Sequence, residues 1–293
     1  MNTGHKVIRY IALAFAIGII FSIVSVGYHV IGFLSNGMVN NTKVSSEILK
    51  LEKDPTKKVL DIKVNAAKVN IIYGDELNAT TDSEYVKITK KNNSLIITEK
   101  KHSIFKEHGT VTVTIPNSVE NFDAVSIISG VGKVNSKALI NTEILEVSSG
   151  VGDTTFDLIN VFKKGNIEAG IGDFKIKNGE LNNTQLELGI GEVKITALLL
   201  GKTKIESGIG SVNLELIGSK DDYTITAEKG IGSITVDGKS LSDDSSYGNG
   251  SNRIDIEGGI GSINVKFKVL LIEVDPNATY DMSTESQKNI EVR

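Results

Sequence analysis

The chain of 293 residues contains no cysteine, no tryptophan and only three prolines, and its only arginines are Arg9, Arg253 and Arg293. Without cysteine there is no disulfide framework, no thiolate zinc site and no lipid-modified cysteine anchor. The formal net charge of −4 offers no concentrated basic face, so we expect no nucleic-acid partner. Because proline cannot donate a hydrogen bond to a β-ladder, its scarcity suits long, uninterrupted ladders.

The segment from Tyr10 to Leu34 lacks charge and is almost wholly apolar. It has about 25 residues, against the roughly 20 needed to cross a bilayer, and therefore predicts a transmembrane helix over residues 10–34. A cleaved signal peptide is the less favoured alternative, because its apolar stretch is shorter and a small-residue cleavage site follows it. Lys6 and Arg9 precede the span, so the positive-inside rule places residues 1–9 in the cytoplasm and the rest outside the cell membrane.

Three further segments follow the predicted span. We expect residues 35–58 to form a polar linker with a single helical turn around residues 46–50. Residues 59–268 show strand character from their start, because apolar and polar residues alternate through stretches such as Leu60, Ile62 and Val64. Residues 269–293 are expected to add one strand and a polar tail.

Seven copies of a glycine-bracketed aliphatic residue organise the middle of the chain. Their first glycines lie 20, 20, 19, 19, 22 and 29 residues apart. Such a period is the mark of an array in which each repeat buries its apolar face against its neighbours, so the sequence predicts an all-β, single-stranded β-helix or β-solenoid. The copies are Gly130-Val131-Gly132, Gly150-Val151-Gly152, Gly170-Ile171-Gly172, Gly189-Ile190-Gly191, Gly208-Ile209-Gly210, Gly230-Ile231-Gly232 and Gly259-Ile260-Gly261.

The seven central aliphatic residues are predicted to stack as an internal ladder with a spacing of about 4.8 Å. The residue before the first glycine is usually small, which indicates a crowded inner corner where glycine supplies positive φ or close approach. Burial of each aliphatic side chain stabilises by roughly 1.5 to 3 kcal/mol, so we expect Ile209→Asp to disrupt the solenoid. The irregular segment 237–251 leaves the register of the last copy open.

Three kinds of chemical site were considered, and each is less favoured than a structural role. Dinucleotide-binding loops need a helix after the glycines, and no helix-forming stretch follows any copy. Calcium-binding nonapeptides place acids beside glycines, as Asp153 and Asp173 are placed, but their period is 9 rather than near 20. His102, Glu107 and His108 lack another well-spaced ligand, so we expect a charged loop there. We therefore expect no metal and no cofactor.

Catalysis is also disfavoured. Many β-helices cleave polysaccharides, but such sites need clustered carboxylates with a base or metal, whereas the acids here are scattered about one per turn. The insertion at residues 243–250 is expected to be a solvated loop, with a recognition loop as the alternative. We therefore expect the protein not to be an enzyme.

Residues 60–71, residues 111–116 and the glycine repeats after them together resemble the bacterial putative-adhesin family of unknown function, over residues 59–268. The resemblance implies a single-chain β-helix in envelope-associated proteins, often on a membrane anchor and sometimes linked with envelope-stress systems, and it implies no catalytic residues. The expected function is an adhesin-like surface that contacts an unidentified envelope or membrane protein.

The alternative is a regulatory module of an envelope-stress sensing system that acts through its transmembrane helix. Small residues at Gly18, Ser22, Ser25 and Gly27 permit helix contacts, although their spacing is loose. The identity of the partner and the oligomeric state do not follow from the sequence.

Overall fold

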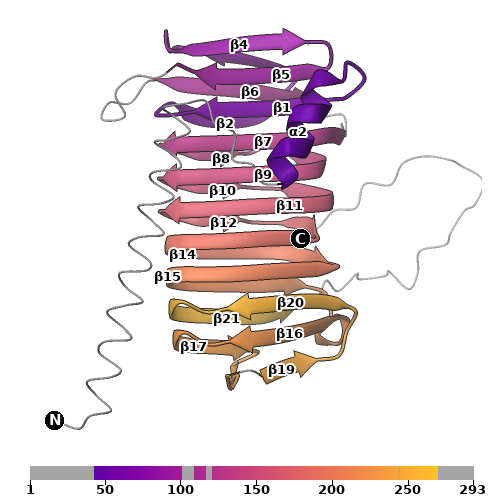
Figure 1. The fold of residues 1–293 in the computed structure, drawn as a ribbon, viewed down its shortest axis with the longest axis vertical. Helices are drawn as coiled ribbons and strands as arrows, with labels where there is room; N and C mark the ends of the chain where they lie inside the picture. Colours follow the sequence, from indigo (N-terminus) through magenta and orange to yellow (C-terminus); the bar gives the residue numbers. More distant parts are fainter. Residues whose placement is uncertain (1–42, 101–108, 117–120, 244, 270–293) are drawn as a thin grey trace, which may run out of the picture.

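The computed structural model describes residues 43–100, 109–116, 121–243 and 245–269. The predicted transmembrane helix, the charged loop expected around His102, and the strand and polar tail expected after Val269 lie outside these residues. Within the described ranges, no helix is both long and apolar enough to cross a bilayer. The chain forms an elongated β-solenoid whose coils stack along one axis (Figure 1), which confirms the predicted all-β solenoid.

The first half of the described chain contains one helix and ten strands. They are α2 (Lys43–Lys53), β1 (Val59–Val64), β2 (Lys68–Gly74), β3 (Asn78–Thr81), β4 (Val86–Lys91), β5 (Ser94–Glu99), β6 (Thr110–Pro116), β7 (Asn121–Val131), β8 (Val134–Ser136), β9 (Ile140–Val151) and β10 (Thr154–Phe156).

The second half contains the remaining strands and a short 3-10 helix. They are β11 (Ile159–Ile171), β12 (Phe174–Ile176), β13 (Gly179–Asn182), β14 (Thr184–Leu200), β15 (Lys202–Ile217), η1 (Lys220–Asp222), β16 (Tyr223–Glu228), β17 (Ile231–Val236), β18 (Lys239–Ser240), β19 (Ser245–Gly248), β20 (Asn252–Glu257) and β21 (Ile260–Lys268).

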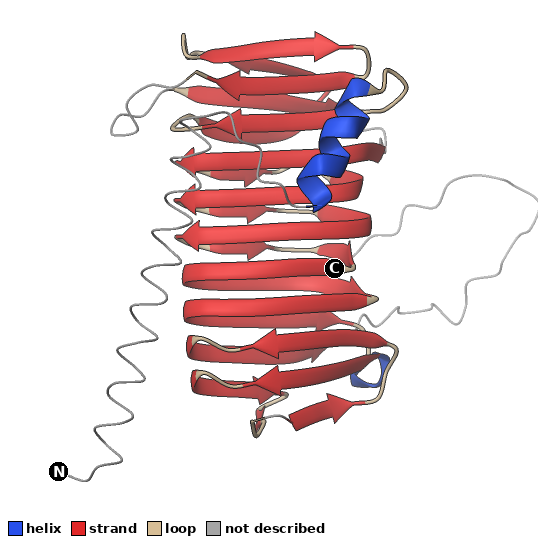
Figure 2. Ribbon diagram, viewed as in Figure 1, coloured by secondary structure: helices blue, strands red, loops and turns tan. Residues whose placement is uncertain are grey.

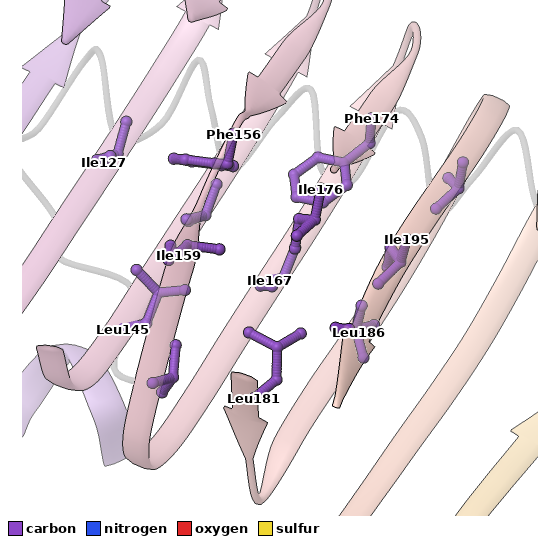
Figure 3. Close-up of a cluster of buried hydrophobic side chains, with 14 of the residues drawn as sticks. Ile127, Leu145, Phe156, Ile159, Ile167, Phe174, Ile176, Leu181, Leu186 and Ile195 are labelled. Carbon is purple, nitrogen blue, oxygen red and sulfur yellow. The ribbon is translucent and has the colours of Figure 1, made fainter. Parts of the chain in front are cut away.

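Parallel pairing between successive coils places equivalent residues of the repeats above one another. In the core, Ile167 pairs with Val147 on one side and Leu186 on the other, and all three side chains are buried. On the next side of the coil, Phe156 and Phe174 pack with ring centroids 6.2 Å apart. Figure 3 shows Ile167, Leu186, Phe156 and Phe174 among the side chains that fill this interior. Alternation of apolar and polar residues thus produces a continuous apolar column inside the solenoid.

The order of the coils departs from the order of the chain at both ends. The first coil, β1 and β2, lies between the coil of β5 and β6 and the coil of β7 and β8. At the other end, β21 pairs with both β15 and β17, so the last coil lies between two earlier ones. The register that the sequence left open is therefore settled, because Ile260 pairs with Ile209 and with Ile231.

Short antiparallel strands cover the outer coils. At the N-terminal end β3 pairs with β6 and β4 pairs with β5, and at the C-terminal end β18 pairs with β17 and β19 pairs with β16. The outermost strand β4 carries Lys87, Lys90 and Lys91. Charged edge strands oppose edge-to-edge association, so β4 closes the N-terminal end of the solenoid without a flat apolar edge.

Helix α2 is longer than the single turn expected within residues 35–58, and it does more than connect. It packs across β1, β7 and β9, as Figure 2 shows. The spacing of Val44, Ile48 and Leu51 produces an apolar stripe of helical period. This stripe packs on Val59, Ala124 and Ile144. The tertiary contacts explain why these eleven residues are helical, since isolated helices of this length are marginal in water.

Candidate interaction surface

The seven central aliphatic residues form a ladder in register along one corner of the solenoid, as predicted. In spatial order the ladder reads Val131, Val151, Ile171, Ile190, Ile209, Ile260 and Ile231.

The predicted burial of this ladder is wrong. Val151, Ile171 and Ile231 are 47%, 39% and 47% exposed, and the other four side chains are only partly buried. The chain turns at the two flanking glycines, so the aliphatic residue lies at the apex of the bend instead of continuing the inward face of the preceding strand. The interior is filled by residues farther from the corner, such as Ile167 and Phe174.

Both glycines of each copy are required, for different reasons. The second glycine of every copy has φ between 133° and 154°, a backbone conformation that residues with a Cβ atom rarely adopt. A Cβ atom on the first glycine would overlap the backbone of the neighbouring coil. At Gly208, for example, it would lie inside van der Waals distance of the carbonyl oxygen of Gly189. The repeat therefore marks a close approach between backbones.

We expect the exposed corner and the buried face of one strand to respond differently to the same substitution. Ile167→Ser should lower the free energy of unfolding by about 2 to 5 kcal/mol, whereas Ile171→Ser should change it by about 0.5 kcal/mol or less. Thermal unfolding of the full chain followed by circular dichroism checks both values. Equal losses of unfolding free energy in the two variants would contradict the outward orientation of Ile171. The expected disruption by Ile209→Asp loses its basis, because Ile209 occupies the same partly exposed corner.

A column of five glutamates runs beside this corner on the outer face of the long strands. Pairing between β11, β14, β15, β20 and β16 places each glutamate next to another, at the strand spacing of about 4.8 Å. The sequence contains a signal for this column, because glutamate stands two residues before the first glycine in five of the seven copies. The small residue directly before the first glycine is the more regular feature of the corner and does not itself point to these glutamates. Its members, in spatial order, are Glu168, Glu187, Glu206, Glu257 and Glu228.

Lys204 neutralises part of the column. Its Nζ lies 2.6 Å from Glu206 and 2.8 Å from Glu257, and hydrogen bonds to these two carboxylates raise the pKa of Lys204. Glu168, Glu187 and Glu228 have no ion pair within the described part of the chain. Desolvation, followed by the charges of Glu168 and Glu206, raises the pKa of Glu187. The column therefore retains uncompensated negative charge.

Glu187→Gln should raise the melting temperature at pH 7 and have less effect at pH 4. Folding favours the protonated form of Glu187, because its pKa lies above the ordinary value of 4.5. The wild-type chain therefore loses stability as the pH rises through that raised pKa, and the variant escapes the loss. The matched variant Glu206→Gln removes a carboxylate paired with Lys204 and should show no such gain. If Glu187→Gln changed the melting temperature by the same amount at pH 7 and pH 4, the raised pKa of Glu187 would be contradicted.

The part of the chain that matches a known protein family has nearly the same boundaries as the solenoid. Residues 56–266 match the family model described as Toastrack DUF4097. The chain belongs to this family. The match confirms the resemblance inferred from the sequence, and it covers the coils together with their end strands. The comparison with curated proteins found no match.

Two solved structures are similar to the Toastrack chain. One is a putative cell adhesion protein from Clostridium sporogenes, with 17% identity, a TM-score of 0.29, and coverage of 72% of this chain and 93% of that one. The other is a putative adhesin from Bacteroides fragilis, with 14% identity, a TM-score of 0.34, and coverage of 71% and 91% respectively.

Asp153 and Asp173, which stand beside glycines as calcium ligands do in nonapeptide repeats, hold neighbouring coils of the Toastrack domain together. Asp153 pairs with Lys133 at 2.7 Å and accepts a hydrogen bond from the backbone nitrogen of Asp173. Asp173 accepts one from the backbone nitrogen of Glu192 at 3.3 Å. Among the residues that the structure describes, no group of three or more potential ligands could hold a metal ion.

The insertion in the Toastrack domain is more ordered than the solvated loop that we expected. Ser245–Gly248 form β19, and Tyr247 stacks on Phe267 with ring centroids 6.1 Å apart. Strand β19 borders an open groove of about 500 Å³. Polar and charged side chains line the groove, among them Lys202, Lys204, Thr226, Asp255 and Glu257.

Most of the charged groups of this groove pair with one another, and Glu228 is the exception among the described lining residues. Asp255 accepts a hydrogen bond from Thr226 at 2.6 Å and pairs with Lys202 at 3.3 Å. These contacts, with the Thr226 hydrogen bond foremost, lower the pKa of Asp255. A carboxylate held ionised in this way serves packing between strands better than proton transfer near neutral pH.

Proposed function

We propose that this Toastrack protein is a non-enzymatic, membrane-anchored module whose extracytoplasmic solenoid is an adhesin-like interaction surface in the cell envelope. The proposal rests on the repetition of surface side chains along the axis of the solenoid. The same apolar and acidic side chains recur at the same place in successive coils and face outward. Catalysis needs different groups that converge on one reacting atom, whereas repeated groups along a line suit contact with an extended partner.

The proposed anchor is the apolar segment 10–34, with residues 1–9 in the cytoplasm and the solenoid outside. Helix α2 packs directly on the solenoid, so only residues 35–42 separate the anchor from the folded domain. Eight residues span at most about 28 Å when fully extended. In this arrangement the domain is held close to the membrane surface.

Cross-linking in intact cells, followed by identification of the attached proteins, tests this proposal. We expect the full chain to capture envelope or membrane proteins through residues of the solenoid. The matched variant replaces residues 10–34 with an unrelated apolar span of the same length. Capture should persist in this variant, because the proposed contact surface is unchanged.

The second candidate function is a regulatory module that pairs with a membrane partner through the helix. Gly18, Ser22, Ser25 and Gly27 favour it, because small residues let transmembrane helices approach closely. If capture disappears with the substituted span and a sensor kinase is the protein lost, the regulatory function replaces the adhesive one.

A further inference from the structure

The exposed aliphatic corner is an apolar surface without a partner in the described chain. We call it the apolar ridge, defined by Val131, Val151, Ile171, Ile190, Ile209, Ile260 and Ile231. Six intervals of about 4.8 Å make it roughly 29 Å long. Each aliphatic residue of the ridge has a glycine on both sides in the chain, so its immediate neighbours carry no side chain that could cover it. Three of its seven side chains are 39 to 47% exposed and the other four are partly exposed. Exposed apolar side chains that recur along one line mark an interaction site.

Acidic side chains border the apolar ridge on both sides. Glutamate stands three positions before the aliphatic residue in five copies, and Asp153, Asp173 and Glu192 stand two positions after it. Eight acids thus occur within three residues of the seven apices, against two bases, Lys133 and Lys229. Lys133 is already paired with Asp153. Lys194 pairs with Glu192, and Lys204 pairs with Glu206 and Glu257. The other four acids, Glu168, Asp173, Glu187 and Glu228, have no ion pair among the described residues, so the surroundings of the apolar ridge keep a net negative charge.

This charge pattern selects among the possible occupants. A membrane rich in anionic lipids would place like charge against the acidic borders. A second copy packed ridge to ridge would do the same. Both arrangements are opposed by electrostatic repulsion. A partner that carries an apolar stripe between basic residues satisfies both the apolar and the charged requirements.

We propose that the apolar ridge binds a cationic amphipathic helix of another protein. A helix rises 1.5 Å per residue, so about 20 residues match a ridge of roughly 29 Å. Apolar side chains at the i, i+3 and i+4 positions would contact the aliphatic residues, and lysine or arginine on either side would meet the glutamates and aspartates. The inference rests on the proposed interaction function and specifies the surface and the chemistry of its partner.

The test measures binding of a synthetic peptide to the full chain in phosphatidylcholine nanodiscs. The probe is a 22-residue helix with a leucine stripe flanked by lysines, and its counterpart carries glutamate at every lysine position. We expect the lysine peptide to bind at least tenfold more tightly than the glutamate peptide. Added salt should weaken its binding, because the charged contacts are exposed to solvent.

Variants of the protein locate the binding site. The triple variant Val151→Ser, Ile171→Ser and Ile231→Ser should weaken binding of the lysine peptide at least tenfold. Its melting temperature should fall much less than that of Ile167→Ser, because the three side chains are 39 to 47% exposed whereas Ile167 is fully buried. Phe162→Ser is the matched control, since Phe162 is 38% exposed and lies outside the ridge, and it should leave the affinity unchanged.

Three results would overturn the inference. They are equal affinity of the wild type and the folded triple variant, tighter binding of the glutamate peptide, and binding to phosphatidylglycerol vesicles that exceeds binding to the lysine peptide. Cross-linking in cells separates this inference from the proposed function. If the triple variant still captures the same envelope proteins through the solenoid, the ridge is not the contact surface, although the interaction function stands.

Discussion

Gly210→Val will destabilise the centre of the solenoid by about 3 to 6 kcal/mol, a large part of the margin of roughly 5 to 15 kcal/mol typical of folded domains. Gly210 has φ of 140°, which valine adopts only with strain. A Cβ atom there would also overlap the carbonyl oxygen of Gly191 in the adjacent coil. Thermal and urea unfolding of the full chain, monitored by circular dichroism, measure the loss.

Two control variants separate the causes of this loss. Gly238→Ala introduces Cβ at φ of 75° where no other atom lies within 4 Å, so it measures conformational strain alone, about 1 kcal/mol. Ile209→Ala tests removal of the apex side chain and should also have a small effect. A melting temperature for Gly210→Val similar to those of both controls would show that the coils do not approach as closely as the structure indicates.

Phe174→Ala should cost about 3 to 5 kcal/mol, because it leaves a cavity in the core beside Phe156. Phe174 is 1% exposed, and solenoid stability depends on contacts between adjacent coils. The loss should therefore affect the coils on both sides of β12. Phe162→Ala, which removes a ring of the same size from the surface, is the control. Comparable unfolding free energies for the two variants would mean that the ring of Phe174 contributes little to the core.

The repeat of about 20 residues, the solenoid and the bend at the paired glycines could be predicted from the sequence, because glycine spacing and apolar alternation are local properties. The prediction failed on the direction of the apex side chain. The alternation through Ile167 and Ala169 suggests an inward Ile171, but a glycine on each side allows a bend that turns it outward. Local pattern does not fix that bend. The glutamate column could have been found by aligning the seven copies over a wider window.

Pairings between distant segments were beyond prediction for a different reason. Nothing near Ile260 in the sequence indicates that it lies between Ile209 and Ile231, because parallel ladders of similar composition accept several orders. The docking of α2 likewise depends on Ala124 and Ile144, which occur about 75 or more residues later in the chain. These features depend on tertiary contacts rather than on local preference.

The position of the first coil determines how the molecule bears mechanical load. A pull from the N-terminal side passes through α2 and reaches β1, which is clamped between β5 and β7. Extraction of that coil requires the ladders on both of its sides to break, whereas a coil at a free end is held by one ladder alone. The same holds for β21 between β15 and β17. Tension applied at either terminus therefore meets a coil that is paired on both sides, and not a coil at the open end of the stack.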